Sequence, residues 1–161
     1  MITKIISGAQ TGADQGGLAA GKALKLKTGG VAPKGFRTET GSNPSLKESY
    51  KITEHKSYAY QPRTIENVKH SDGTVWFGNQ NSPGGKLTIN TCIKLKKPYV
   101  INPSKLQLID WINKKFINVL NVAGNRESTN SGLQHKVEWF LTLVLSSKEY
   151  KKENENGRKC V

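Results

Sequence analysis

Residues 3–26 read TKIISGAQTGADQGGLAAGKALKL, and this stretch predicts how the chain begins to fold. Residues 3–7 are a short apolar run, which is typical of a buried β-strand. The segment from Gly8 to Gly17 is rich in glycine, and the alanines and leucines after it recur at helical spacing. A strand, a glycine-rich turn and a helix in this order predict the opening of an α/β fold.

The rest of the chain alternates strand-like and helix-like segments. Apolar or β-branched runs predict four further strands, at residues 28–32, 74–77, 98–102 and 117–124. Apolar residues at helical spacing predict helices at residues 62–71, 86–97, 104–115 and 133–145. Pro62 suits the first position of its helix, and Ser104 is a good N-cap. The alternation predicts a doubly wound, mostly parallel α/β sheet of about five strands with helices on both faces.

The length of 161 residues is typical of a single domain. We expect one ligand-binding domain over residues 1–146. Residues 147–161 are rich in charge and poor in apolar residues, so we expect a disordered tail there. Residues 33–62 are rich in turn formers, and so long an irregular stretch is unusual unless it has a role such as covering a site.

The composition disfavours several classes of protein. No apolar run is long enough for a transmembrane helix, and the first apolar stretch is too short for a signal peptide. The two cysteines, Cys92 and Cys160, lack the spacing of a metal site or of a disulfide scaffold. We therefore expect a cytoplasmic protein without a membrane partner.

The formal net charge of +13 favours an anionic partner. Lysine supplies 21 of the 25 basic residues, and the lysines are scattered along the chain as on an ordinary solvated surface. Because the chain has no concentrated basic stripe and no recognised nucleic-acid-binding motif, nucleic acid is the less favoured partner. Most of the four arginines lie in loop-like segments, where a guanidinium can hold a phosphate with two hydrogen bonds.

The loop after the first strand combines glycines with hydroxyl groups at the start of a helix. In parallel α/β sheets, ligands bind at the carboxyl ends of the strands, where such loops lie. Glycines let the backbone approach a ligand, and the helix directs its free N–H groups at the loop. An ordinary glycine turn with a Thr or Asp helix cap explains the same residues. The candidate phosphate ligands here are Ser7, Gly8, Ala9, Gln10, Thr11, Gly12 and Asp14.

The loop after the third strand, SPGGKLT at residues 82–88, repeats this arrangement. A glycine pair directly before a helix exposes consecutive N–H groups to an anion. A tight loop entering an ordinary helix is the alternative. The candidate ligands here are Gly84, Gly85, Lys86 and Thr88.

Further candidates lie in the middle of the chain and after the fifth strand. The last loop contains Gly124 and Arg126, although Arg126 and Glu127 equally suit a surface ion pair. Arg63 and Asn67 are four residues apart, on one face of the predicted helix. The set of candidate ligands is completed by Lys34 and Asp72.

Catalytic groups are sparse in this sequence. The three histidines, His55, His70 and His135, belong to no recognisable pattern with a cysteine or an aspartate. No cluster of metal-ligating residue types is visible. We predict no catalytic residue and no metal ligand.

These segments, in this order, resemble the putative molybdenum carrier family, whose members are related to the molybdenum cofactor carrier proteins. The resemblance covers most of residues 2–128. The matching segments are IISGAQTGADQGGLAAGKAL (5–24), GGVAPKGFRTETG (29–41), ITEHKSYAYQPRTIENVKHSDGTVWFG (52–78), SPGGKLT (82–88), KKPYVIN (96–102) and LNVAGNRES (120–128). The resemblance implies a Rossmann-like fold, a cytosolic homo-oligomer (a dimer or a tetramer) and a small anionic ligand. That ligand would be the molybdenum cofactor or a nucleotide-like molecule.

The same family is similar in fold to nucleoside-monophosphate phosphoribohydrolases, whose PGGxGTxxE motif supplies a glutamate for the glycosidic chemistry. The corresponding segment here is PGGKLTIN, and Thr91 stands near the position of that glutamate. Because glycosidic cleavage needs a carboxylate, we favour a binding or carrier protein for a small phosphorylated ligand over an enzyme. The alternative is a nucleotide-processing enzyme that uses Asp14, Glu66 or Asp72.

Overall fold

The central sheet consists of five parallel strands, which confirms the predicted fold class. The computed structural model describes residues 1–151. The strands are Lys4–Ile6 (β1), Lys27–Gly29 (β2), Gly73–Phe77 (β7), Tyr99–Ile101 (β8) and Val119–Gly124 (β9). Their order across the sheet is β2-β1-β9-β7-β8, and every neighbouring pair is parallel. The last strand in the sequence therefore lies at the centre, between β1 and β7.

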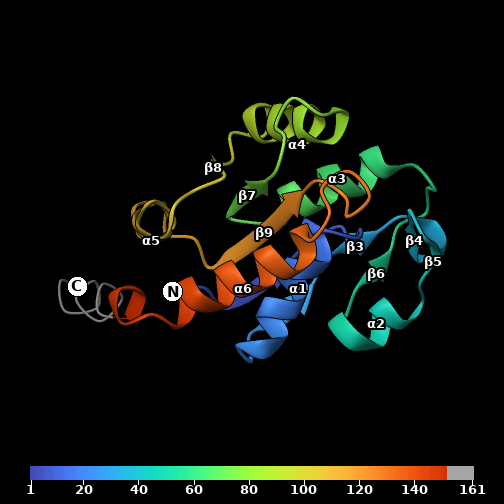
Figure 1. Cartoon of the computed structure of the whole chain (residues 1–161). Coiled ribbons are helices and arrows are strands. Elements are labelled where there is room, and N and C mark those ends of the chain that lie inside the picture. The colour runs from blue at the N-terminus through green and yellow to red at the C-terminus, as the bar shows by residue number, and fades with distance from the viewer. Residues whose placement is uncertain (152–161) are drawn as a thin grey trace.

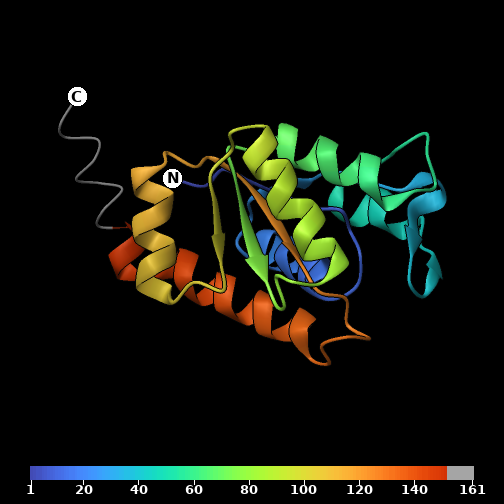
Figure 2. The ribbon, with the colours of Figure 1, turned by 90° about the horizontal axis from the view of Figure 1, so that it is seen from above.

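Helices cover both faces of this sheet, as predicted for a Rossmann-like fold (Figure 1). The five longer helices are Ala13–Ala23 (α1), Tyr60–Lys69 (α3), Pro83–Lys94 (α4), Lys105–Lys114 (α5) and Leu133–Ser146 (α6). Helices α1 and α6 lie together on one face, and α3 and α4 lie together on the other, as the view from above also shows (Figure 2). The described residues contain no helix that is long and apolar enough to cross a membrane.

The two faces of the sheet differ in chemistry because side chains alternate along each strand. Val75 and Phe77 belong to the main hydrophobic core with residues of α1, α5 and α6. The Phe77 ring meets the Phe140 ring edge to face, with 5.7 Å between the centroids. Thr74 and Asn121 lie on the other face, where the Asn121 amide donates a hydrogen bond to the Thr74 hydroxyl over 3.1 Å. The face beneath α3 and α4 is thus the polar one.

Three predicted boundaries are wrong by two or three residues, for local reasons. Helix α3 begins at Tyr60, so Pro62 is its third residue, in the first turn where proline costs no hydrogen bond. Helix α4 begins at Pro83 because the Ser82 hydroxyl caps it by accepting from the Gly85 amide. The predicted strand 28–32 is split at Gly30, whose φ of 123° turns the chain out of the sheet. By contrast, the prediction that Ser104 caps α5 is confirmed, with a complete capping box.

The segment predicted to be irregular forms a series of very short elements beside the sheet. They are Val31–Ala32 (β3), Lys34–Phe36 (η1), Arg37–Thr38 (β4), Gly41–Ser42 (β5), Ser45–Tyr50 (α2) and Thr53–Glu54 (β6). Strands β4 and β5 form an antiparallel hairpin, and β3 pairs with β6 in parallel. A second hydrophobic cluster, which includes Phe36, Leu46 and Ile52, packs this segment against Leu18 of α1.

The folded part of the chain extends beyond the predicted boundary at residue 146. Residues 148–151 form a helical turn, and the Tyr150 side chain belongs to the main hydrophobic core. The Tyr150 hydroxyl accepts a hydrogen bond from the Ile2 amide over 2.7 Å. Part of the segment predicted as a tail is therefore packed, because the Tyr150 ring within this charged stretch is buried in the main hydrophobic core. The remaining part, residues 152–161, lies outside the described residues.

Candidate anion-binding site

A cavity of about 340 Å³ opens at the carboxyl ends of β1, β7 and β9. The order of the strands brings together the loops that follow these three strands, which are far apart in the sequence. The candidate residues that line the cavity are Gln10, Asp14, Arg63, Gly84, Thr88, Gly124 and Arg126. The lining also includes residues that the sequence did not single out as ligands: Tyr60, Thr64, Trp76, Ser82, Pro83, Leu87, Ala123, Asn125 and Thr129.

Backbone amides of the first loop are engaged by side chains of the loop itself. The Ala9 amide donates to the Ser7 hydroxyl over 3.0 Å, and the Thr11 amide donates to the Gln10 side-chain carbonyl over 3.0 Å. The Gln10 amide donates to the Asp14 carboxylate over 3.3 Å. The amides of Ala9, Gln10 and Thr11, which we predicted to hold a phosphate, therefore have acceptors within the chain in this structure.

Asp14 and Arg63 form a buried ion pair in the wall of the cavity. The distance between Arg63 Nη1 and Asp14 Oδ2 is 3.4 Å, and their side chains are only 12% and 4% exposed. Burial raises the pKa of Asp14 above its usual range, although the Arg63 guanidinium and backbone hydrogen bonds, including one from Gln10, act against this. The guanidinium lies directly on Gly8, where an added Cβ would be 1.5 Å from Arg63 Nη1. Gly8 thus provides the space that Arg63 occupies.

Three arginines surround the ring of Tyr60. The guanidinium carbons of Arg37, Arg63 and Arg126 lie 5.5, 5.6 and 4.8 Å from the centroid of this ring. They come from β4, α3 and the loop after β9, so the fold assembles them from three separate segments. Such a concentration of positive charge favours an anionic ligand.

Three buried N–H donors on residues that line the cavity have no hydrogen-bond partner within the described part of the chain. They are the side-chain amide Nε2 of Gln10, the Nε of Arg63 and the indole Nε1 of Trp76. A buried donor without a partner costs about 1–3 kcal/mol, so such groups are rare in folded proteins. All three donors belong to residues that line the same cavity.

The N-terminus of α4 forms the opposite wall of the cavity. Ser82 and Gly84 line it, and the Ser82 hydroxyl accepts hydrogen bonds from the Gly85 amide and from the Asn125 side chain, each over 3.1 Å. The Asn125 side chain also accepts from the Asn79 amide, over 2.5 Å. Asn125 therefore joins the loops after β7 and β9, and the positive end of the α4 dipole lies at the cavity.

Several candidate residues lie away from this cavity. The Asp72 carboxylate accepts from the Asn118 and Val119 amides at the start of β9, at the opposite end of the sheet. The Asn67 side chain hydrogen-bonds both backbone groups of Val31 and so holds β3 in place. The polar groups of these two residues thus hold strands, and neither residue lines the cavity.

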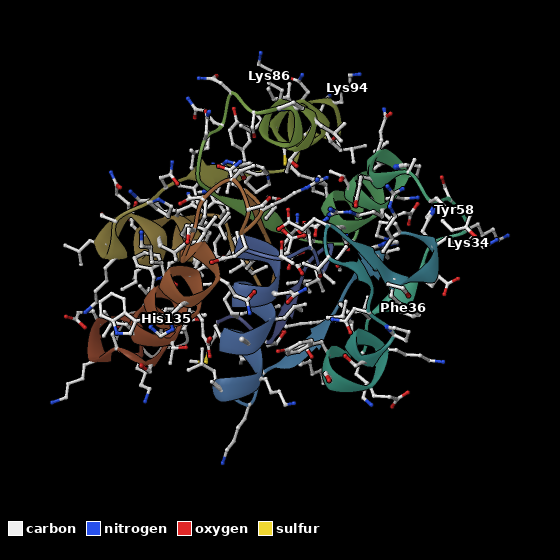
Figure 3. All side chains as sticks on the ribbon, turned by 45° about the vertical axis from the view of Figure 1, so that its right-hand side comes forward. Lys34, Phe36, Tyr58, Lys86, Lys94 and His135 are labelled. Atoms are coloured by element: carbon white, nitrogen blue, oxygen red, sulfur yellow. The ribbon has the colours of Figure 1, made fainter. Side chains whose placement is uncertain are left out.

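The two candidate lysines also lie outside the cavity. Lys34 is exposed and lies against the ring of Tyr58, with 5.2 Å between its Nζ and the ring centroid. Figure 3 shows this pair at the outer edge of the molecule, and it shows Lys86 extending outward from α4. Neither lysine lines the cavity, so the prediction that they contact the ligand is not supported by their positions.

Thr11, Gly12 and Gly85 contact other parts of the chain. The Gly85 amide, as described above, donates to the Ser82 hydroxyl. Thr11 lies in a neighbouring open hollow with Glu39, to which its hydroxyl donates a hydrogen bond. A Cβ on Gly12 would be 2.4 Å from the Asn125 carbonyl oxygen, so this glycine allows the first and last loops to touch. The described residues include no group of three or more His, Cys, Asp or Glu side chains arranged to hold a metal ion.

The two glycines at the start of α4 are expected to respond differently to the same substitution. Gly84→Ala adds a Cβ 3.7 Å from Trp76 Cη2, which is ordinary contact, whereas in Gly85→Ala it would be 2.4 Å from the Gln80 carbonyl oxygen. We expect Gly84→Ala to change the free energy of unfolding by less than about 1 kcal/mol. Gly85→Ala should lower it by about 1–3 kcal/mol. Urea denaturation of both variants measures this; equal effects would contradict the described packing of α4.

Sequence reasoning missed Tyr60, Trp76 and Arg37 as candidate site residues. Trp76 lies in the middle of an apolar run, so only its position on the polar face of the sheet distinguishes it from a core residue. Tyr60 is the first residue of α3, in a stretch that we predicted to be a loop. The one available signal was the scarcity of arginine, since three of the four arginines of the chain gather at Tyr60.

Comparison with known proteins identifies relatives of this chain. Residues 5–145 match the model of the circularly permutated YpsA SLOG family. The chain is also similar to a crystal structure of a "Putative molybdenum carrier protein" from Syntrophus aciditrophicus SB, with 33% sequence identity and a TM-score of 0.81. The similarity covers 90% of this chain and 96% of that one. No curated protein matches the chain.

Proposed function

Because the chain belongs to the circularly permutated YpsA SLOG family, we propose that it is a binding or carrier protein for a small phosphorylated ligand. The ligand is the molybdenum cofactor or a nucleotide-like molecule, held in the cavity at the carboxyl ends of β1, β7 and β9. The relative from Syntrophus aciditrophicus, which is described as a molybdenum carrier, supports the first of these two ligands.

The observation that carries this proposal is the set of unpartnered donors on Gln10, Arg63 and Trp76. A phosphate group at neutral pH offers oxygen acceptors and negative charge. It would satisfy these donors, all of which belong to residues that line the cavity. We expected backbone amides to be the main ligands, but the amides of Ala9, Gln10 and Thr11 already have acceptors within the chain.

The residues that line the cavity fit a ligand that combines a phosphate with a planar ring. Tyr60 and Trp76 offer aromatic surface, and Pro83, Leu87 and Ala123 offer apolar contacts. The volume of about 340 Å³ is at the lower end of the range for small-molecule sites. No cysteine or histidine lines the cavity in the described chain, so the molybdenum cofactor would be held through its phosphate and ring, with the metal carried as cargo.

Identification of bound small molecules by native mass spectrometry, combined with thermal unfolding, tests this proposal. Ligand at 100 times its Kd stabilises a protein by about 2.7 kcal/mol, which for a chain of this size raises the Tm by about 5–10 °C. We expect such a rise with molybdenum cofactor or with a nucleoside monophosphate. A protein that is purified without ligand and shows no rise with either compound would contradict the proposal.

A hydrolytic function is the second candidate, and it now depends on one carboxylate. Asp14 lines the cavity and has a raised pKa, as catalytic acids often have. Glu66 instead pairs with His70 on the surface of α3, and Asp72 lies at the other end of the sheet. Incubation with nucleoside monophosphates separates the two functions. Release of free base that is lost in Asp14→Asn would favour the enzyme, and the absence of release favours the carrier.

A further inference from the structure

We propose that the mouth of the cavity holds a second anion subsite, formed by Arg37 and Arg126 beside Tyr60. This subsite takes the outer phosphate of a ligand that contains two linked phosphates, such as a nucleoside diphosphate. The inference rests on the proposed function, because the inner phosphate of that ligand occupies the cavity.

The three arginines at the Tyr60 ring differ in how their charges are paired. Arg63 is paired with Asp14, but neither Arg37 nor Arg126 forms an ion pair with a carboxylate in residues 1–151. Both side chains instead lie against the Tyr60 ring. Their guanidinium carbons are 5.5 Å (Arg37) and 4.8 Å (Arg126) from the centroid of the ring. An anion bound at this ring would balance the charge of both guanidinium groups.

Arg37 is held in position by the hairpin to which it belongs. Arg37 lies on the β4–β5 hairpin, and Glu39 at the tip of this hairpin fastens it to two loops. The Glu39 amide donates to the Gln10 side chain over 2.8 Å, and the Glu39 carboxylate accepts from the Ser128 amide over 3.2 Å and from the Thr11 hydroxyl. Arg37 is therefore positioned by the same loops that build the cavity, although its own segment contributes no residue to the lining.

Glu39 remains ionised at neutral pH and so keeps the hairpin fastened. Although burial acts to raise the pKa of Glu39, hydrogen bonds from Ser128 and Thr11 lower it overall. The nearby charge of Arg126 acts in the same direction. Hydroxyl and amide donors engage the oxygens of Glu39, which thereby holds the hairpin that positions Arg37. Within residues 1–151, neither Arg37 nor Arg126 lies within ion-pair distance of Glu39.

The arginines of the inner and outer subsites contact one aromatic ring. Arg63, whose unpartnered Nε belongs to the inner site, lies at the same ring as Arg37 and Arg126. The inner and outer subsites therefore share the Tyr60 ring. Two phosphates joined by one bridging oxygen suit such a pair of subsites better than two phosphates at opposite ends of a molecule. Arginine suits both positions because its planar fork makes two hydrogen bonds to a phosphate.

Isothermal titration with inorganic phosphate and inorganic pyrophosphate tests this inference. We expect the wild-type protein to bind pyrophosphate at least about tenfold more tightly than phosphate. The second phosphate of pyrophosphate adds a charge-assisted hydrogen bond, which accounts for an increase in affinity of this size. Arg37→Gln should reduce this preference to about threefold or less while leaving the affinity for phosphate unchanged. Lys34→Gln is the matched control, because it removes the same charge three residues away, from a side chain directed toward Tyr58 at the molecular edge (Figure 3).

The outcomes separate the inference from the proposed function. Equal binding of the two anions, or a preference that survives Arg37→Gln, would overturn the second subsite and leave the carrier function standing. A loss of preference in both Arg37→Gln and Lys34→Gln would show a general charge effect and would also overturn it. If neither anion binds the wild-type protein, the proposed function fails and the inference fails with it.

Discussion

Replacing Arg63 with glutamine is expected to lower the free energy of unfolding at pH 7 by about 3 kcal/mol, because the buried Asp14 carboxylate then lacks its charged partner. Both side chains are largely buried, at 12% and 4% exposure, so solvent screens the pair weakly. The same change should abolish ligand binding, since Arg63 also lines the cavity. Urea denaturation with the wild-type protein as reference measures the first effect.

The destabilisation by Arg63→Gln should depend on pH in a definite direction. In the folded wild-type protein the pKa of Asp14 is raised above 3.8, so stability falls as pH rises from that value through the folded pKa. Loss of the Arg63 charge raises the pKa of Asp14 in the folded protein further. The pH range over which stability falls therefore extends to higher pH. The difference between variant and wild type should therefore grow with pH, and it should nearly vanish below 3.8, where Asp14 is protonated in both states.

A surface pair provides the control for this experiment. Lys51 and Glu48 lie 3.8 Å apart with side chains that are 73% and 79% exposed. Lys51→Gln should leave the stability unchanged within error, because exposed pairs contribute little. If Arg63→Gln behaves like Lys51→Gln at every pH, the described pairing of Asp14 with Arg63 is incorrect.

Gly8→Ala is expected to weaken ligand binding by at least about tenfold. Gly8 has no side chain, and the Arg63 guanidinium occupies the space where a Cβ would lie. The new Cβ would be 1.5 Å from Arg63 Nη1 and 2.2 Å from Arg63 Cζ, so the guanidinium must move away from the first loop. That movement removes Arg63 from Asp14 and from the ligand together. Titration of the variant with the ligand identified by mass spectrometry measures the loss.

Gly84→Ala is the matched control for Gly8→Ala. It adds the same methyl group at the opposite wall of the cavity, where the nearest atom of Trp76 is 3.7 Å away. We expect this variant to keep its affinity within about threefold. If Gly8→Ala binds the ligand as tightly as the wild-type protein does, ligand binding does not depend on the described position of Arg63.

Much of the fold could be predicted because the strands are short and clearly bounded. The run at 74–77 and the β-branched run ending at Gly124 became β7 and β9, which lie side by side in the sheet. The segment between residues 33 and 62 could not be predicted in the same way. Its strands are two residues long, too short for any periodicity, and tertiary contacts such as those of Phe36 hold them.

The site could be predicted only in outline. The prediction that loops after the first, third and fifth strands gather at one edge follows from parallel topology. The sequence did not predict that local hydrogen bonds engage the loop amides: Asp14, a candidate ligand, accepts from the Gln10 amide of the first loop. Which side chains would then face the cavity depended on long-range contacts, such as that of Arg37 with Tyr60, and spacing in the sequence does not encode them.

The most direct test of the anion-binding cavity is the side-chain indole signal of Trp76 in a ¹⁵N–¹H spectrum. The chain contains three tryptophans, and of these only the Trp76 indole is both buried without a partner and part of the cavity lining in the described structure. Addition of inorganic phosphate at millimolar concentration should shift the Trp76 indole proton downfield as it gains an acceptor, while the signals of Trp111 and Trp139 stay in place. Saturable binding of phosphate that leaves the Trp76 signal unmoved would place the anion elsewhere and contradict the proposed site.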